Sequence, residues 1–509
     1  MRGWWLACLL FVPLVAGSDT VYKRGNQVTD SGELTLARLM SLKQIAKPMQ
    51  GEFVTVYLDA DAGSDSNDGL TPATAWETFD KVSDVFAEMG CGLEVVLNSG
   101  VIWDADADFG PGCAAGNTNC GMDAMAPTCA DTDRIAMYMH SSDPDVRAVV
   151  NCTAMTNDGD DIFFSNPATD GGWVVYEGVQ GIGCAADIFN AGNAGKVLVV
   201  NSHANTTLTT TSNILTSHTT SSLIALNWGG TTNPVSASAQ AVAAIGDSKL
   251  VSITNGHIEV GPTSGNDACL DASDAATVTH IGGTCSVTTG ALGTSYGVHS
   301  NPNTSGDVAT VNVARLSVDV VNSSTSGQGM RAIASGAGEN AIIIAYQMTL
   351  QGDTNDLITD ATDPGAGATV LIECWDCVLG EYQAAQAIDV RDATSGVDTT
   401  IRGRLLVDDA EGTNTFLISG AAGSPFETVA ALAAATPAGW DLTLTDTTNP
   451  VQWGTNPGLA CDKDLECFQA ANINYCIPMA APIPKWVLGT DADITELCLN
   501  GDGRNSGAR

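Results

Sequence analysis

The sequence predicts an all-β protein built as a parallel β-helix, a solenoid of stacked coils with a short helical cap at each end. Between Asp161 and Gly420, a short apolar run, a turn of small residues and a β-branched run return in that order about every 20 to 35 residues. The chain also holds 54 glycines, as many tight turns require. Units of this size cannot bury an apolar face alone, so they must stack on one another.

The spacing of the β-branched runs supports this fold. The clearest runs are centred on Val251, Val278, Val311, Ile343, Leu371 and Ile401. Their separations are 27, 33, 32, 28 and 30 residues, and two further sets of short apolar runs flank them. Three strands in a turn of about 28 residues indicate a parallel β-helix. A β-sandwich also has many short strands, but it needs no equal spacing. The residues expected to point inward include Val251, Val298, Val311, Ile333, Ile343, Ile388 and Ile401.

Charge limits the range of partners. The chain has 20 basic and 58 acidic residues, which gives a formal net charge of −38. Such a field repels nucleic acid and anionic lipid, so neither is expected to bind. An acidic surface that stays soluble in salt, or one that binds cations, fits this composition. Nothing in the sequence indicates the oligomeric state.

The first 17 residues have the features of an export signal. Arg2 provides the positive start, Trp4 to Val15 the apolar stretch, and Val15-Ala-Gly17 the small-residue cleavage site. Residues 18–50 form a leader segment. The apolar stretch is too short for a membrane span, and no later run reaches that length. A secreted or cell-surface protein is therefore expected.

The cysteine count agrees with export. Of the 15 cysteines, Cys8 leaves with the signal, and an even number remains, which favours disulfides. Cys374-Trp-Asp-Cys377 has the spacing of a redox motif or half a zinc site, but its place on a predicted strand with no nearby histidine favours a structural pair. The local pairs expected are Cys113 with Cys120, Cys374 with Cys377, and Cys461 with either Cys467 or Cys476.

Residues 51–110 are expected to form a strand, a loop and a capping helix. The expected strand begins the segment at Val54, Gly63-Ser-Asp-Ser-Asn-Asp-Gly69 is the loop, and Trp76, Phe79, Val82 and Phe86 form one apolar helical face. This segment resembles the beginning of secreted bacterial right-handed parallel β-helix repeat proteins of the pectate-lyase-like superfamily. The resemblance implies a right-handed solenoid over residues 111–420. A helix here would cover the open edge of the first coil.

Residues 421–509 resemble the C-terminal cap of the same family. Ser424-Pro-Phe-Glu427 is a capping box with proline at the first helical position. The family includes polysaccharide lyases, glycoside hydrolases and proteins without known activity. The resemblance therefore implies a protein that binds or processes extracellular polysaccharide, with lyase chemistry as one route. The alternative is a non-catalytic adhesion or surface-structural protein, in which the repeats are a rigid spacer.

Candidate site residues follow from an alignment of one strand set by its inward residues Leu270, Val298, Ile333, Ile358 and Ile388. Side chains on the outer face of stacked strands can line one surface about 4.8 Å apart from coil to coil. A lyase needs a base and a cation that holds the substrate carboxylate. Strict alternation would point Arg331 and Asp360 inward. The predicted catalytic residues are His299, Arg331, Asp389 and Arg391, and the predicted substrate-binding residues are Asp271 and Asp360.

Two further patterns are open. Asp158-Gly-Asp-Asp161 and Gly256-His257 are similar to motifs of polygalacturonase-type hydrolases, although they lie far apart and the Arg-x-Lys partner is absent. Two acidic clusters have oxygen ligands suited to calcium, the expected cofactor, but plain acidic turns are the alternative. The predicted metal ligands are Asp61, Asp65 and Asp68 in one cluster and Asp104, Asp106 and Asp108 in the other.

Overall fold

The computed structural model divides the chain into two units, Glu52–Asp446 and a second unit formed by Met1–Gly51 with Thr447–Arg509. In the second unit, β33 (Leu465–Ala470) and β34 (Ile473–Pro478) form an antiparallel hairpin. The residues that the structure describes are 53–104, 125–132, 134–152, 162–184, 187–206, 212–232, 239–254, 256–261, 266–289, 293–322, 326–352, 354–361, 367–379, 386–392, 399–407, 415–418, 441–446, 465–470 and 473–478.

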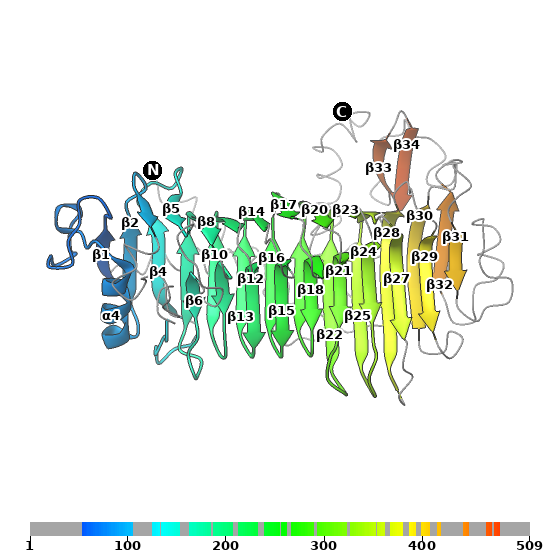
Figure 1. Ribbon diagram of the computed structural model, residues 1–509, viewed down its shortest axis with the longest axis horizontal. Coiled ribbons are helices and arrows are strands. Elements are labelled where there is room, and N and C mark those ends of the chain that lie inside the picture. Colours follow the sequence, from blue (N-terminus) through cyan, green and yellow to red (C-terminus); the bar gives the residue numbers. More distant parts are fainter. Residues whose placement is uncertain are drawn as a thin grey trace, which may run out of the picture. The chain divides into compact units, whose positions relative to one another are not determined.

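The larger unit is a right-handed parallel β-helix, and every pairing between its described strands is parallel (Figure 1). The predicted parallel β-helix is confirmed, and the β-sandwich is excluded. The first of three stacks of strands consists of β1 (Val54–Leu58), β2 (Leu93–Leu97), β4 (Ile135–Ser141), β7 (Trp173–Glu177), β10 (Lys196–Val200), β13 (Ser222–Leu226), β16 (Lys249–Ile253), β19 (Thr277–Ile281), β22 (Val308–Ala314), β25 (Asn340–Tyr346), β28 (Thr369–Leu379) and β30 (Thr399–Val407).

The second stack joins the first through β28, which pairs with strands of both, and β30 pairs with β32 (Asp441–Asp446). The other strands of the second stack are β3 (Ile102–Asp104), β5 (Ala148–Asn151), β8 (Val179–Cys184), β11 (His203–Thr206), β14 (Gly229–Thr232), β17 (His257–Val260), β20 (Thr284–Thr289), β23 (Ser317–Asn322) and β26 (Thr349–Gln351).

The third stack is a separate sheet of ten strands, each paired in register with the strand of the next coil. This sheet carries the candidate site residues. Its strands are β6 (Phe163–Ser165), β9 (Phe189–Ala191), β12 (Ser212–Thr219), β15 (Ala239–Gly246), β18 (Asp267–Ser273), β21 (Thr294–Asn301), β24 (Ser326–Ile333), β27 (Asn355–Ala361), β29 (Gln386–Asp392) and β31 (Thr415–Ile418).

Most of the predicted inward residues lie in the core. Val298, Val311, Ile343, Ile388 and Ile401 are all buried within it. Register pairs Val278 with Val311 and Val311 with Ile343, at the spacings that the sequence predicts. Apolar side chains therefore stack directly on one another along the solenoid, which buries each coil against its neighbours.

Two of the predicted inward residues are wrong. Val251 is only partly buried, and its neighbour Leu250 is the core residue that pairs with Val278. Ile333 is also partly buried, and Met330 takes the inward position beside Val298. In a strand, an error of one or three residues exchanges the two faces, because side chains alternate.

A left-handed residue recurs at the corner between the first and second stacks. Positive φ angles occur at Gly178, Asn201, Asn227, Gly282, Arg315 and Gln347. Glycine and asparagine tolerate this conformation at little cost, and they occupy four of these six corners, where they end the first-stack strand sharply. The Asn227 side-chain amide donates to Asn201 Oδ1 over 2.8 Å, and Arg315 Nε donates to Gln347 Oε1 over 3.1 Å. These contacts link corners of successive coils.

A helix, α4 (Phe79–Met89), follows the 3-10 turn η1 (Pro72–Thr74) where the apolar spacing predicts one, and it lies beside β1 and β2 (Figure 1). Phe79, Val82 and Phe86 are buried in the same core as the coils. The Phe79 ring meets the Trp103 ring edge to face, with centroids 5.7 Å apart. The helix predicted after Ser424 lies outside the described residues.

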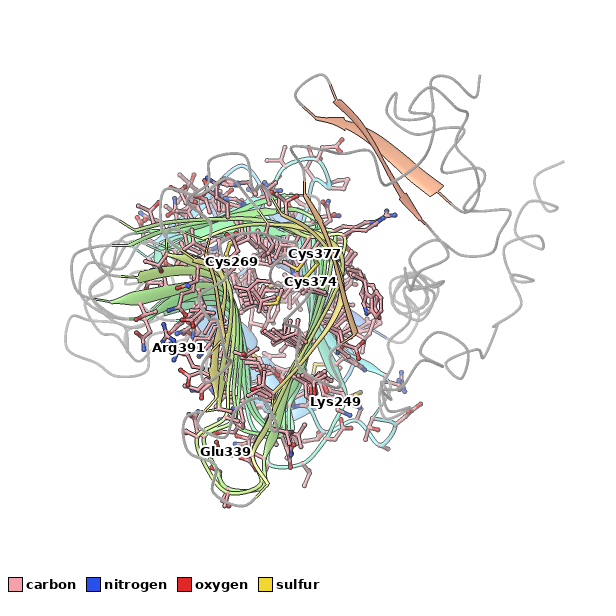
Figure 2. The ribbon with its side chains drawn as sticks, turned by 90° about the vertical axis from the view of Figure 1, so that its right-hand side faces the viewer. Lys249, Cys269, Glu339, Cys374, Cys377 and Arg391 are labelled. Carbon is pink, nitrogen blue, oxygen red and sulfur yellow. A yellow bond between two sulfur atoms is a disulfide. The ribbon has the colours of Figure 1, made fainter. Side chains whose placement is uncertain are left out.

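Three disulfides join described residues. Cys374–Cys377 confirms one predicted pair, and the Cα atoms are 5.8 Å apart. Cys91–Cys129 and Cys269–Cys285 were not predicted. Viewed along the stack, the sulfur atoms of Cys269, Cys374 and Cys377 lie inside the ring of strands (Figure 2). The predicted partners Cys113, Cys120 and Cys461 lie outside the described residues, as do residues 1–50.

Candidate functional site

The register of the third stack places four of the predicted site residues in one row. Asp271 pairs with His299, His299 with Arg331, and Arg331 with Ile358, which in turn pairs with Asp389. The inner row beside them is Leu270, Val298, Met330, Leu357 and Ile388. Using Ile333 and Ile358 as inward residues was therefore wrong.

The remaining two predicted residues form an adjacent row. Asp360 pairs with Arg391, and each lies two residues beyond the first row, so both share its outward face. Figure 2 shows Arg391 on the outer side of the strands. The expectation that alternation turns Arg331 and Asp360 inward does not hold, because the inward residues of their strands are Met330 and Leu357. All six predicted catalytic and substrate-binding residues lie on one surface.

His299 is held by Asp271. His299 Nδ1 lies 2.7 Å from Asp271 Oδ1, and the Ser273 hydroxyl donates to Asp271 Oδ2 over 2.9 Å. An ionised carboxylate only accepts hydrogen bonds, so Nδ1 carries the proton. In the neutral ring, Nε2 is then the atom with the free lone pair, and it is the atom that can accept a proton.

Tyr296 completes this part of the site, although sequence reasoning missed it. Its ring stacks on the His299 ring with centroids 4.2 Å apart and an interplanar angle of 7°. Alternation does not predict that residues three apart share a face. Gly297 and Val298 both face inward here, because a Cβ added at Gly297 would lie 2.2 Å from Val318 Cγ1 inside the solenoid. The Tyr-Gly step at a strand corner was the available signal.

Arg331 joins the two rows. Its Nη2 donates to Asp360 Oδ2 over 2.7 Å, and its Nη1 donates to the Tyr296 hydroxyl oxygen over 3.1 Å. The guanidinium carbon lies 5.7 Å from the Tyr296 ring centroid. The positive charge is thus fixed between a carboxylate and an aromatic ring, and the Tyr296 hydroxyl proton remains available for donation.

Arg391 is held in the same way. Its Nε donates to Asp389 Oδ2 over 2.7 Å. Burial raises the pKa of Asp389, and the nearby charge of Asp360 acts in the same direction, while Arg391 and Arg331 oppose the rise. The carboxyl therefore holds a proton at higher pH than an ordinary aspartate.

The side chains of the candidate site differ in how far they are exposed to solvent. The Arg391 side chain is 43% exposed, and those of Arg331 and His299 are 14% and 12% exposed. The Asp360 and Asp389 side chains are only 5% and 1% exposed. Asp360 and Asp389 thus lie behind Arg331 and Arg391 and orient them, whereas the Asp271 side chain is as exposed as that of His299. A ligand approaching this face would meet the guanidinium of Arg391 before any carboxylate.

The first predicted metal cluster mainly stabilises its own loop. Asp65 accepts hydrogen bonds from the Glu77 and Thr78 backbone and from the Thr78 hydroxyl. Asp68 accepts from the Leu70 backbone and the Thr74 hydroxyl, which lowers its pKa. Asp61 donates its backbone N–H to Asp59 Oδ1 over 3.0 Å. Within the described residues, no group of three or more His, Cys, Asp or Glu side chains is arranged to hold a metal ion.

The second metal cluster is only partly described. Asp104 Oδ1 accepts from the Asn151 side-chain amide over 2.7 Å, whereas Asp106 and Asp108 lie outside the described residues. Calcium binding stays a prediction for both clusters. The hydrolase-like Asp158–Asp161 motif also lies outside the described residues. His257 is on the second stack, where its Nδ1 lies 2.9 Å from Thr284 Oγ1.

No protein-family model and no curated protein matches this sequence. Among solved structures, the native crystal structure of a GH136 lacto-N-biosidase from Eubacterium ramulus is similar at a TM-score of 0.28 and 10% identity, over 72% of this chain and 65% of that one. Its selenomethionine derivative gives a TM-score of 0.23 and 9% identity, over 72% and 67%. Scores this low carry no argument about activity. None of the described helices is long and apolar enough for a membrane span.

Proposed function

We propose that this chain binds or processes an extracellular polysaccharide on the outer face of the third stack, by lyase chemistry on an acidic sugar. The observation that carries the proposal is the set of three basic side chains, each oriented by a buried aspartate. His299 is held by Asp271, Arg331 by Asp360, and Arg391 by Asp389. The three disulfides support an exported protein.

The arrangement suits a polymer that carries carboxylates. His299 and Arg391 lie on β21 and β29, three strand spacings apart, which is about 14 Å at about 4.8 Å for each spacing. The site therefore spans several sugar units of an extended chain. A chain with a net charge of −38 repels anions in general, so an anionic polymer needs a local cationic face such as this one.

Proton transfer can be assigned to named atoms. His299 Nε2 takes the proton from the carbon beside the substrate carboxylate, and Arg331 on the neighbouring strand binds that carboxylate, while Arg391 binds a carboxylate of another sugar unit along the polymer. The electron pair of the broken C–H bond forms a C=C bond as the C–O bond to the next sugar breaks. The Tyr296 hydroxyl donates a proton to the departing oxygen, and Arg331 stabilises the phenolate that results.

The test is incubation of the full chain with alginate, pectate and glycosaminoglycans, following the absorbance of unsaturated sugar ends. The expected result is product on one uronate polymer, lost in His299→Gln and reduced in Arg391→Ala. Lys249→Ala is the matched control, because Lys249 is an exposed basic residue on the first stack, away from Arg391 (Figure 2). Equal activity in all three variants would refute the site.

A non-catalytic adhesion or structural role is the second candidate. It is favoured by the burial of Asp360 and Asp389, because a carboxylate that only fixes an arginine contributes to rigidity whether or not chemistry follows. Binding without product on every polymer, lost in Arg391→Ala but retained in Lys249→Ala, would support this role. Reducing ends without unsaturation would instead indicate hydrolysis.

A further inference from the structure

A second cluster of ionisable groups lies on the outer face of the first stack, near its N-terminal end. Glu94 on β2 pairs in register with Tyr138 on β4, and His140 on β4 pairs with Glu177 on β7. The His140 and Glu94 side chains are 23% and 12% exposed. The cluster is therefore partly shielded and lies on a different sheet from the candidate site.

Both ring nitrogens of His140 face oxygen atoms that only accept hydrogen bonds. Nδ1 lies 2.9 Å from the Ser141 carbonyl oxygen, and Nε2 lies 3.3 Å from Glu94 Oε1. A neutral imidazole has one N–H and could satisfy only one of these acceptors. The imidazolium ion has two N–H groups and satisfies both, so this geometry selects the protonated ring.

Neighbouring groups hold Glu94 and the ring in place. The Thr55 hydroxyl on β1 donates to Glu94 Oε2 over 2.6 Å, and the Tyr138 ring stacks on His140 with centroids 4.7 Å apart. The hydrogen bond with His140 lowers the pKa of Glu94, against the effect of burial. Burial alone would lower the pKa of His140, but Glu94 and the Ser141 carbonyl raise it above its ordinary value.

We propose that His140 and Glu94 form a pH-sensitive clamp between β2 and β4, closed while both ring nitrogens of His140 carry protons. Loss of one ring proton removes the positive charge that attracts the Glu94 carboxylate and leaves a ring lone pair facing one of the two acceptors, so the clamp weakens. Because β2 and β4 belong to the first coils, opening the clamp loosens the N-terminal end of the solenoid before the coils that follow it.

The groups that face His140 favour a clamp that is closed at low pH and opens as pH rises. Among the described residues, the titratable groups on the outer face of the packed strands are Glu94 on β2, Tyr138 on β4 and Glu177 on β7, with Tyr57 of β1 in the same row as His140 beyond Val96. Tyr176 of β7 is buried in the core. The two glutamates favour the protonated ring. A raised pKa gives stabilisation that is fully present at low pH and is lost as pH rises through the folded-state value.

The test uses the full chain with isotope-labelled histidine rings. The sequence has six histidines, so each ring signal can be assigned by single substitution. The His140 signal is expected to titrate above pH 6.5, the ordinary histidine value, and its midpoint should fall in Glu94→Gln, because the hydrogen bond and the charge that raise it are lost. His218→Gln is the matched control, because His218 faces Asp187 at 3.7 Å on the third stack. It should leave the His140 midpoint unchanged.

Melting temperature provides the second readout. The wild-type chain should melt above His140→Gln at about pH 5.5, and the difference should shrink as pH rises through the titration midpoint of the ring. Glutamine cannot titrate but can still donate to Glu94, so it isolates the effect of charge. A His140 midpoint at or below 6.5, or a melting difference independent of pH, would overturn the clamp.

Discussion

Acid should destabilise the solenoid through one buried histidine, His280. Its ring lies inside the stack, fully buried, in the row between Ser252 and Val313. Trp228 Nε1 donates to Ser252 Oγ over 2.7 Å, the Ser252 hydroxyl donates to His280 Nδ1 over 3.0 Å, and His280 Nε2 donates to the Gly282 carbonyl over 2.8 Å. A neutral His280 ring satisfies all three of these hydrogen bonds. A second ring proton would place a positive charge in the apolar core.

The size of the stability loss in acid follows from the pKa of His280. Burial lowers it from 6.5 to about 4, against the hydrogen bond to Gly282, which raises it. At about 1.4 kcal/mol for each pKa unit, a difference of about 2.5 links about 3.5 kcal/mol to protonation. The unfolded chain binds this proton first, so the contribution of His280 to stability is full above pH 6.5 and is lost as pH falls toward 4.

The perturbation is His280→Val, which copies the Val313 side chain stacked on His280 in the next coil. Urea unfolding of both proteins, followed by tryptophan fluorescence, gives the free energy of unfolding from about pH 7.5 to about pH 4.5. Wild type should lose about 2 to 3 kcal/mol more than the variant over this range. His257→Val, at an exposed histidine, controls for loss of a titrating ring. Parallel pH profiles for wild type and His280→Val would refute the reasoning.

Three other outcomes are expected. Asp360→Ala should cost about 3 kcal/mol, because it leaves the partly buried Arg331 charge without its carboxylate. Lys249→Ala, at an exposed position, should cost under about 1 kcal/mol. Thermal unfolding of both variants checks this, and equal costs would contradict it. Replacing Cys269 and Cys285 together by alanine should cost about 3 kcal/mol in urea, because their disulfide closes a loop of sequence separation 16, and an unchanged midpoint would show that it adds nothing. Sodium chloride should raise the melting temperature, and millimolar calcium at matched ionic strength should raise it further; no increment would exclude the calcium sites.

The sequence was sufficient for the kind of fold but not for the facing of individual strands. Runs such as Val278, Val311 and Ile343 mark the coils because each buries the same position of a repeating unit. In the third stack, successive inward residues lie 28, 32, 27 and 31 residues apart, from Leu270 through Val298, Met330 and Leu357 to Ile388. With turns of unequal length, the period alone does not select Met330 over Ile333.

At the candidate site, too, the sequence predicted part of the arrangement and the structure decided the rest. The residue types His299, Arg331 and Arg391 could be chosen from the sequence, because basic residues are scarce among 58 acidic ones. The partnership of each with an aspartate, and the place of Tyr296 against His299, could not be predicted. Arg331 and Asp360, and likewise Asp271 and His299, are nearly thirty residues apart and meet only when coils stack.

The sequence by itself determined an all-β solenoid, its coil spacing and its acidic character, because a recurring apolar unit has few ways to bury its face. The tertiary structure decided which side chains lie outside. At Gly297 the strand turns a corner with two consecutive inward residues, which brings Tyr296 and His299 to one face. Local alternation fails at such a corner, because the backbone there follows the stacking of neighbouring coils and not the pleat of one strand.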